Sequence, residues 1–185
     1  MITENIEDAI MVYHNIINHE FCEKVSTYID KMCVKPLTAF DTDIEYRKVA
    51  GHTLTKNTIS ERIYFKKIYD EIWNFYPNYN FRFPQVKCTK LEQIDLLKYE
   101  AGGRYFYHCD NHGVLSPRTL STIINLNDEY EGGDLVFGHQ YLNSEMKRIS
   151  LKKGSVAVFP SNFLFPHKIE PITKGKRYSI VSWLL

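Results

Sequence analysis

The sequence predicts an α+β fold that is mainly β, in which two helices pack against a double-sheet β structure. Two segments near the N-terminus carry apolar residues at helical spacing, whereas after Pro84 the chain breaks into short apolar runs. Glycines stand between these runs, where sharp turns of an antiparallel chain need positive φ angles. Several short strands at this spacing are typical of a sandwich or a barrel.

The N-terminal part is expected to begin with a short strand over residues 10–17 and a helix over residues 18–32. A second amphipathic helix is expected over residues 60–75, ended by Pro77. Between the two helices, residues 38–58 have few periodic apolar positions, which indicates loops or irregular strands. This segment is therefore a candidate lid.

The C-terminal part is expected to be built from short strands. Glycine pairs at 102–103 and 132–133, together with Gly154 and Gly175, mark the turns. The predicted strands cover residues 93–99, 105–110, 120–126, 134–137, 155–159 and 178–184.

Composition excludes several classes of function. The 185 residues, 44% hydrophobic and 24% charged, are typical of one globular domain with a sizeable core. A net charge of +1 with interspersed signs offers no basic face, so nucleic acid is not expected as a partner. No apolar stretch approaches the ~20 residues that span a bilayer, so no membrane insertion is expected. The four cysteines form no C-x-x-C pair and the N-terminus lacks a signal-peptide layout, which favours a cytoplasmic location.

His108 and Asp110 form an H-x-D motif that can present two ligands to one metal ion. In extended backbone, residues i and i+2 project from the same face, so one strand end offers an imidazole and a carboxylate together. A second imidazole would complete the set of two histidines and a carboxylate that is typical of non-haem Fe(II) oxygenases. His167 stands where a strand is expected to begin. Because H-x-D is common by chance, its sequence context must support the assignment.

That context matches a known family. The chain resembles the prolyl 4-hydroxylase-like branch of the 2-oxoglutarate and Fe(II)-dependent dioxygenases, strongly over about residues 90–185 and weakly in the N-terminal helices. The matching segments, in order, are YEAGGRYFYHCDN (99–111), Arg118, LNDEYEGGDLVF (126–137), KKGSVAVFPS (152–161), His167 and PITKGKRYSIVSW (171–183).

The resemblance implies a double-stranded β-helix, a cupin-like jelly roll, with the N-terminal helices packed on one sheet. We expect a single dioxygenase domain over residues 1–185, with helical support over about 1–85 and a catalytic core over about 86–185. The oligomeric state is not indicated.

The resemblance also implies roles for individual residues. His108, Asp110 and His167 would bind Fe(II), Arg177 would bind the distal carboxylate of 2-oxoglutarate, and Tyr99 would hydrogen-bond this cosubstrate. A guanidinium suits the task because it offers two parallel N–H donors to a carboxylate. O2 is the second cosubstrate, and ascorbate is a further candidate cofactor.

Three positions leave alternatives open. Many relatives carry a tyrosine or another large residue where Asn125 stands, so its amide either donates to 2-oxoglutarate or is a satisfied polar group of the core. Tyr105 and Trp183 are either core aromatics or part of the substrate mouth.

The implied reaction is hydroxylation of an unactivated C–H bond, with release of succinate and CO2. We expect prolyl 4-hydroxylation of a peptide or protein, because a proline-rich strand loses little entropy on docking in an aromatic-lined groove. One alternative is a hydroxylase of a free amino acid or small metabolite. Another is a non-catalytic jelly-roll binding module that keeps the motif residues as structure.

Overall fold

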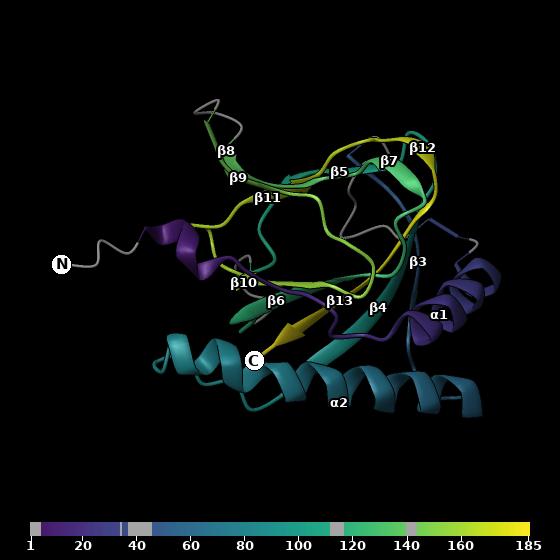
Figure 1. Ribbon diagram of the computed structural model, residues 1–185, viewed down its shortest axis with the longest axis horizontal. Helices are drawn as coiled ribbons and strands as arrows, with labels where there is room; N and C mark the ends of the chain where they lie inside the picture. Colours follow the sequence, from purple (N-terminus) through teal and green to yellow (C-terminus); the bar gives the residue numbers. More distant parts are fainter. Residues whose placement is uncertain (1–4, 34, 37–45, 112–116, 140–143) are drawn as a thin grey trace.

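The computed structural model describes residues 5–33, 35–36, 46–111, 117–139 and 144–185. Two antiparallel sheets lie face to face, and two helices cover the outer face of the larger sheet (Figure 1). The predicted mainly β architecture, with the N-terminal helices on one sheet, is confirmed.

The larger sheet has six strands in the order β1 (Met11–Tyr13), β10 (Val156–Pro160), β6 (Leu120–Asn125), β13 (Arg177–Leu184), β4 (Leu91–Tyr99) and β3 (Ala50–Thr53). The smaller sheet has the order β2 (Arg47–Lys48), β5 (Arg104–His108), β11 (His167–Ile169), β8 (Leu135–His139) and β9 (Ser144–Ile149). Strands β7 (Tyr130–Gly132) and β12 (Ile172–Gly175) form a separate pair, and a short 3-10 helix, η1, covers Ile6–Ala9.

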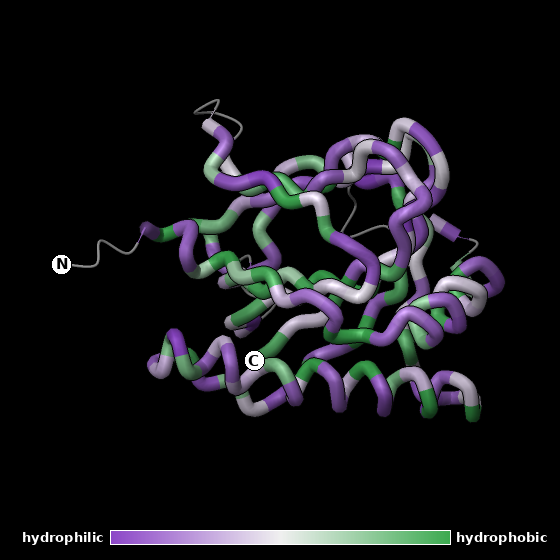
Figure 2. Tube along the Cα trace, viewed as in Figure 1, coloured by the Kyte–Doolittle hydropathy of each residue, from purple (hydrophilic) through white to green (hydrophobic). Residues whose placement is uncertain are grey.

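Helix α1 (His19–Met32) and helix α2 (Ile59–Arg82) begin at side-chain caps. The Asn18 side chain accepts a hydrogen bond from the backbone of Phe21, and Thr58 accepts one from the backbone of Glu61. Apolar residues alternate with polar ones along α2 (Figure 2), which lets one face pack on the sheet. These helices and the outer face of the six-stranded sheet share one hydrophobic core.

The prediction that Pro77 ends the second helix is wrong, because α2 continues to Arg82. Proline removes one helical N–H donor, a cost that packing beyond it offsets. Tyr79 is fully buried, and its hydroxyl donates to the carbonyl of Ala9 at 2.9 Å. Tertiary contacts therefore hold the last turn that the local sequence disfavours.

A second core lies between the two sheets and positions the site. Along β4, Ile94 and Leu96 point into the helix-side core, whereas Leu97 and Tyr99 point into the inter-sheet core. Because both faces of the strand are covered, apolar residues stand on both of its faces, as at the adjacent positions Leu96 and Leu97. Tyr99 consequently faces the interior of the double sheet.

Each of the six predicted C-terminal strands has an observed counterpart, and β11 begins at His167, where a strand is expected. Strands β7, β9 and β12 were not expected. The N-terminal strand is shorter than predicted and covers only Met11–Tyr13.

Part of the candidate lid lies outside the described residues, which omit 37–45. The part that is described contains two strands at sheet edges: β2 pairs with β5, and β3 pairs with β4. The short strands Arg47–Lys48 and Ala50–Thr53 agree with the expectation of loops or irregular strands, and backbone hydrogen bonds fix them to the two sheets. The lid itself stays a prediction. Among the described residues, no helix combines the length and the apolar character that crossing a membrane requires.

Candidate metal and cosubstrate site

The smaller sheet brings His108, Asp110 and His167 together. His108 ends β5 and His167 begins β11, and the two residues face each other in the register of these neighbouring strands. Nε2 of His108 lies 3.5 Å from Oδ1 of Asp110, and Nε2 of His167 lies 3.6 Å from Oδ2. Each residue can offer one ligand atom, and these atoms lie within 4.8 Å of one another. His167, which is distant in the sequence, thus lies beside the H-x-D motif, as the sequence analysis expects.

Backbone carbonyls orient both imidazoles. Nδ1 of His108 lies 2.9 Å from the carbonyl oxygen of Phe106, and Nδ1 of His167 lies 3.2 Å from that of Phe165. A carbonyl can only accept, so Nδ1 carries the hydrogen in each ring. The lone pair of each Nε2 is then free for a metal, as metal-binding histidines require.

Charge and burial set the protonation states of Asp110 and His167. Burial alone would raise the pKa of the Asp110 carboxyl, but the imidazoles of His167 and His108 and the Ser121 hydroxyl hold this pKa below its usual range. Burial, with His108 acting in the same direction, lowers the pKa of His167 to about 4. At neutral pH the site therefore contains a carboxylate and a neutral imidazole at these two positions, the forms that bind metals.

A hydroxyl pair supports the carboxylate. Oγ of Ser121 donates to Oδ2 of Asp110 at 2.6 Å, and Oγ of Ser161 lies 2.8 Å from Oγ of Ser121. Both serines are buried. Sequence reasoning missed them, although the two-residue period of β6 puts Ser121 on the same face as Ile123 of the inter-sheet core.

Arg177 and Tyr99 face each other on β13 and β4. The Arg177 side chain is only 1% exposed, its Nε has no partner, and its Nη1 makes one long contact, 3.4 Å to Oγ of Ser179. No carboxylate of the described chain forms an ion pair with it. A buried guanidinium without a counter-ion is unfavourable, so this arrangement suits an anionic ligand.

A glycine makes room for this arginine. Gly133 has a φ of +71°, and a Cβ there would lie 2.4 Å from Cδ1 of Ile172 and 3.2 Å from Cδ of Arg177. The GGD sequence thus serves both the turn and the path of the arginine side chain.

Arg177 and the His–Asp–His cluster line one small cavity of about 30 Å³. Tyr99, Tyr105 and Trp183 line it too. Tyr105 stacks on the His108 ring with centroids 3.6 Å apart, and burial raises its pKa to about 12. Both aromatic candidates for the mouth thus contact the cavity.

Arg118 connects Trp183 to the metal cluster. Its guanidinium carbon lies 3.6 Å from the centre of the Trp183 ring, and its Nη1 donates to the backbone carbonyl of Asp110 at 3.3 Å. Its Nε also pairs with Oε2 of Glu92 at 2.6 Å. These contacts fix Trp183 at the cavity wall.

Arg47 also lines the cavity, and sequence reasoning missed it. Its guanidinium carbon lies 4.6 Å from the centre of the Tyr105 ring, and its Nε is buried without a partner. No periodic pattern could have indicated it, because it belongs to a two-residue strand in an irregular segment.

Asn125 is fully buried but does not line this cavity. Its Nδ2 donates to the carbonyls of Asn127 and Leu151, and its Oδ1 accepts from the Tyr130 hydroxyl. With both amide hydrogens engaged, this geometry favours the role of a satisfied core residue.

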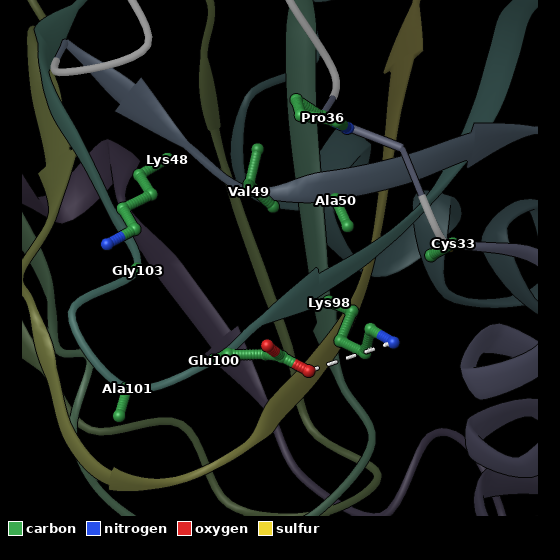
Figure 3. Close-up of a pocket in the computed structure, with 9 residues that line it drawn as sticks. All are labelled: Cys33, Pro36, Lys48, Val49, Ala50, Lys98, Glu100, Ala101 and Gly103. Carbon is green, nitrogen blue, oxygen red and sulfur yellow. Dashed lines mark ion pairs between the residues drawn. The ribbon is translucent and has the colours of Figure 1, made fainter.

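A larger cavity of about 530 Å³ lies beside β3 and the end of β4, and it contains none of the predicted site residues (Figure 3). Its charged groups include Lys98 and Glu100, which are 3.9 Å apart, and Lys48. Lys48 thus points to this cavity, whereas Arg47, its neighbour on β2, points to the metal cluster. The chemistry belongs to the smaller cavity, because that one holds the titratable cluster.

Comparison with known proteins agrees with this geometry. Residues 94–185 match the sequence profile of the 2OG-Fe(II) oxygenase superfamily. A PKHD-type hydroxylase of Stutzerimonas stutzeri is 33% identical over 95 residues, and one of Delftia acidovorans is 35% identical over 99 residues. Each alignment covers 46% of this chain and only 40% of the relative.

Solved structures share the fold at low sequence identity. A Pseudomonas putida prolyl-4-hydroxylase superposes with a TM-score of 0.73 at 15% identity, covering 95% of this chain and 91% of that one. A Trichoplax adhaerens prolyl hydroxylase, solved with a peptide fragment, gives 0.78 at 17% identity, covering 96% and 83%. A viral collagen prolyl hydroxylase from Paramecium Bursaria Chlorella virus-1, solved as a 2OG complex, gives 0.69 at 16% identity, covering 95% of each chain. The double-stranded β-helix that the motifs indicate is confirmed.

Proposed function

Because residues 94–185 carry a domain of the 2OG-Fe(II) oxygenase superfamily, we propose that the protein hydroxylates an unactivated C–H bond with Fe(II), 2-oxoglutarate and O2. His108, Asp110 and His167 bind the iron, and Arg177 with Tyr99 binds 2-oxoglutarate. One observation carries the proposal: a preformed His–Asp–His cluster lines the same cavity as a buried guanidinium that has no counter-ion among the described residues.

The residues present suit both ligands. Two imidazoles and a carboxylate from one side leave the other coordination positions open, as in the facial triad of non-haem Fe(II) oxygenases. The Nε donor of Arg177 has no partner within the described chain, so it is available to a ligand. The metal and Arg177 are therefore suited to hold the two ends of a dicarboxylate, for which the ligand-free cavity of about 30 Å³ must widen.

Iron with bound 2-oxoglutarate supplies the oxygen chemistry, in which 2-oxoglutarate, O2 and the acceptor C–H become succinate, CO2 and a C–OH group. The chain contributes the geometry. Arg177 fixes the distal carboxylate by charge-assisted hydrogen bonds, and the carbonyls of Phe106 and Phe165 keep both imidazoles in the metal-binding tautomer. Ser121 holds the Asp110 carboxylate in place, and the surrounding apolar core excludes water.

The acceptor we propose is a proline within a peptide or protein. The Trichoplax adhaerens neighbour, a prolyl hydroxylase, was solved with a peptide fragment. In the segment that leads to His167, Phe163 is 71% exposed and Leu164 is 42% exposed, which offers apolar contacts to an extended peptide. A free amino acid is the alternative acceptor.

The test is turnover by the purified chain with Fe(II), 2-oxoglutarate and O2 against proline-containing peptides and free amino acids. We expect succinate formation in step with a gain of one oxygen, about 16 Da, on a peptidyl proline. His167→Ala should abolish both signals, and the surface variant Arg148→Met should retain them. Hydroxylation of a free amino acid with every peptide untouched would overturn the acceptor, and absence of any 2-oxoglutarate turnover would overturn the activity.

We also propose a domain organisation and a cellular location. We propose that residues 1–185 form a single domain, supported by the shared core of the helices and the six-stranded sheet. The free thiols of Cys22, Cys33, Cys88 and Cys109 suit a reducing compartment such as the cytoplasm.

A further inference from the structure

A second arginine faces the cavity and has no counter-ion among the residues that the structure describes. The register of β2 on β5 places Arg47 opposite Tyr105, and its guanidinium lies over the Tyr105 ring. Its Nε is buried and unpaired, and among the described residues no carboxylate forms an ion pair with it. Arg47 thus shares the condition of Arg177, except that it is only half-buried and comes from a strand at the sheet edge.

The charges of the cavity do not balance. Among the described residues that line it, two carry a guanidinium group and one, Asp110, carries a carboxylate. Burial raises the pKa of Tyr99, although Arg47 and Arg177 both act to lower it, so both positive charges lie near a hydroxyl that stays neutral. The charge of Fe(II) matches that of dianionic 2-oxoglutarate. One positive charge therefore remains when both are bound.

The two ends of 2-oxoglutarate already have partners in the proposed function, which are Arg177 and the metal. The unmatched charge belongs to Arg47, the more exposed of the two arginines, which comes from the edge strand of the smaller sheet. An unpaired charge in such a site is unfavourable unless a ligand supplies the opposite charge.

We propose that Arg47 binds a carboxylate of the acceptor and so selects acceptors that carry an anionic group beside the carbon to be hydroxylated. The inference rests on the proposed function and narrows its substrate class. The carboxylate can be an acidic side chain next to a peptidyl proline or the carboxylate of a free amino acid.

Binding of the acceptor's carboxylate requires the Arg47 side chain to move. The cavity of about 30 Å³ has room for only one or two water molecules. Leaving the Tyr105 ring breaks a cation–π contact, which is weaker than the charge-assisted hydrogen bonds that a carboxylate offers in return. A neutral acceptor gives no such compensation, so the movement itself favours anionic acceptors.

The neighbouring residue provides a matched control. Lys48 carries the same charge on the same strand, but it lines the larger cavity (Figure 3), whereas Arg47 lines the smaller one. Lys48→Gln removes one positive charge from β2 without touching the site, whereas Arg47→Gln removes the charge that faces it.

The test measures binding of acceptor pairs to the full chain loaded with Mn(II), which is inert, and 2-oxoglutarate. The pairs are blocked tetrapeptides with Asp or Asn before the proline, the same with Asp or Asn after it, and free proline against prolinamide. Calorimetry should show at least one acidic member bound about 10- to 100-fold more tightly than its neutral partner, as charge-assisted contacts support. Arg47→Gln should abolish this preference, Arg47→Lys should retain part of it, and Lys48→Gln should retain all of it.

Two outcomes would overturn the inference: equal binding within every pair by the unaltered chain, or a preference that Arg47→Gln leaves intact. A large loss of 2-oxoglutarate affinity in Arg47→Gln would also overturn it, by making Arg47 a cosubstrate ligand. Selectivity confined to free proline would support the inference and identify a free amino acid as the source of the carboxylate. Arg47-dependent selectivity without hydroxylation in the presence of Fe(II) would support it while refuting the proposed function.

Discussion

Replacing Arg177 by methionine should weaken 2-oxoglutarate binding and at the same time stabilise the protein. The guanidinium is 1% exposed, with an unpaired Nε and one long hydrogen bond. An unsatisfied buried donor costs about 1–3 kcal/mol, which methionine, of similar length, avoids. For a chain of this size that corresponds to a rise in Tm of roughly 2–4 °C per kcal/mol. Loss of the charge-assisted contact should lower 2-oxoglutarate affinity by about ten- to a hundredfold.

Thermal unfolding of the ligand-free variant and calorimetric titration of the Mn(II)-loaded variant with 2-oxoglutarate measure the two effects. Arg148→Met is the control, because Arg148 is paired with Glu145 and Glu170 on the surface. It should leave 2-oxoglutarate affinity unchanged without raising Tm. A lower Tm for Arg177→Met together with unchanged 2-oxoglutarate affinity would refute the reasoning, since Arg177 would then be a structural residue.

Further variants test the metal cluster and the helix cap. Asp110→Ala should abolish Mn(II) binding in calorimetry, because it leaves only two imidazoles; binding equal to that of the unaltered chain would remove Asp110 from the ligand set. Ser121→Ala should weaken Mn(II) binding by roughly tenfold, and Ser121→Thr should restore it if the hydroxyl orients Asp110. Glu61→Gln should lower the free energy of unfolding at pH 7 by about 1.5–3 kcal/mol, because hydrogen bonds from Thr55 and His52 outweigh burial and lower the pKa of Glu61 to about 2. A lowered carboxyl pKa means that the unfolded chain binds more protons, so this difference should be complete above pH 4.5 and shrink as the pH falls toward 2; a difference that stays constant over this range would contradict the assignment.

The fold could be predicted where local pattern and burial agree. Helix α1 begins within one residue of its predicted start because Asn18 is a strong cap. The sequence failed at α2, where Pro77 indicates an end but Tyr79 anchors a further turn through a contact distant in the chain. It also missed strands of two to four residues, such as β2 and β12, because so short a segment has no measurable period.

The residues of the candidate site also divide into those that the sequence could predict and those that it could not. The H-x-D motif, His167 and Arg177 could be assigned because each occurs in a recognisable sequence context, and the structure brings all four residues to one cavity. Arg47 could not, because its position depends on pairing between β2 and β5, which no local pattern encodes. Ser121 could have been found from the inward face of β6, but a serine between apolar residues predicts no partner by itself.

The polar groups of the cavity fall into two classes with different consequences for ligand binding. His108, Asp110 and His167 have hydrogen-bond partners within the chain, so their orientation is set before a metal arrives. Arg47 and Arg177 each have a buried Nε donor that the described chain leaves unpaired, so these two donors are available to ligands. Metal binding therefore costs little free energy for ordering the three ligand side chains. Each anionic ligand, in contrast, also relieves the unfavourable charge of a buried guanidinium. It follows that 2-oxoglutarate should raise the stability of the metal-loaded protein by more than its contact area suggests, and that Arg177→Met should lose most of this gain.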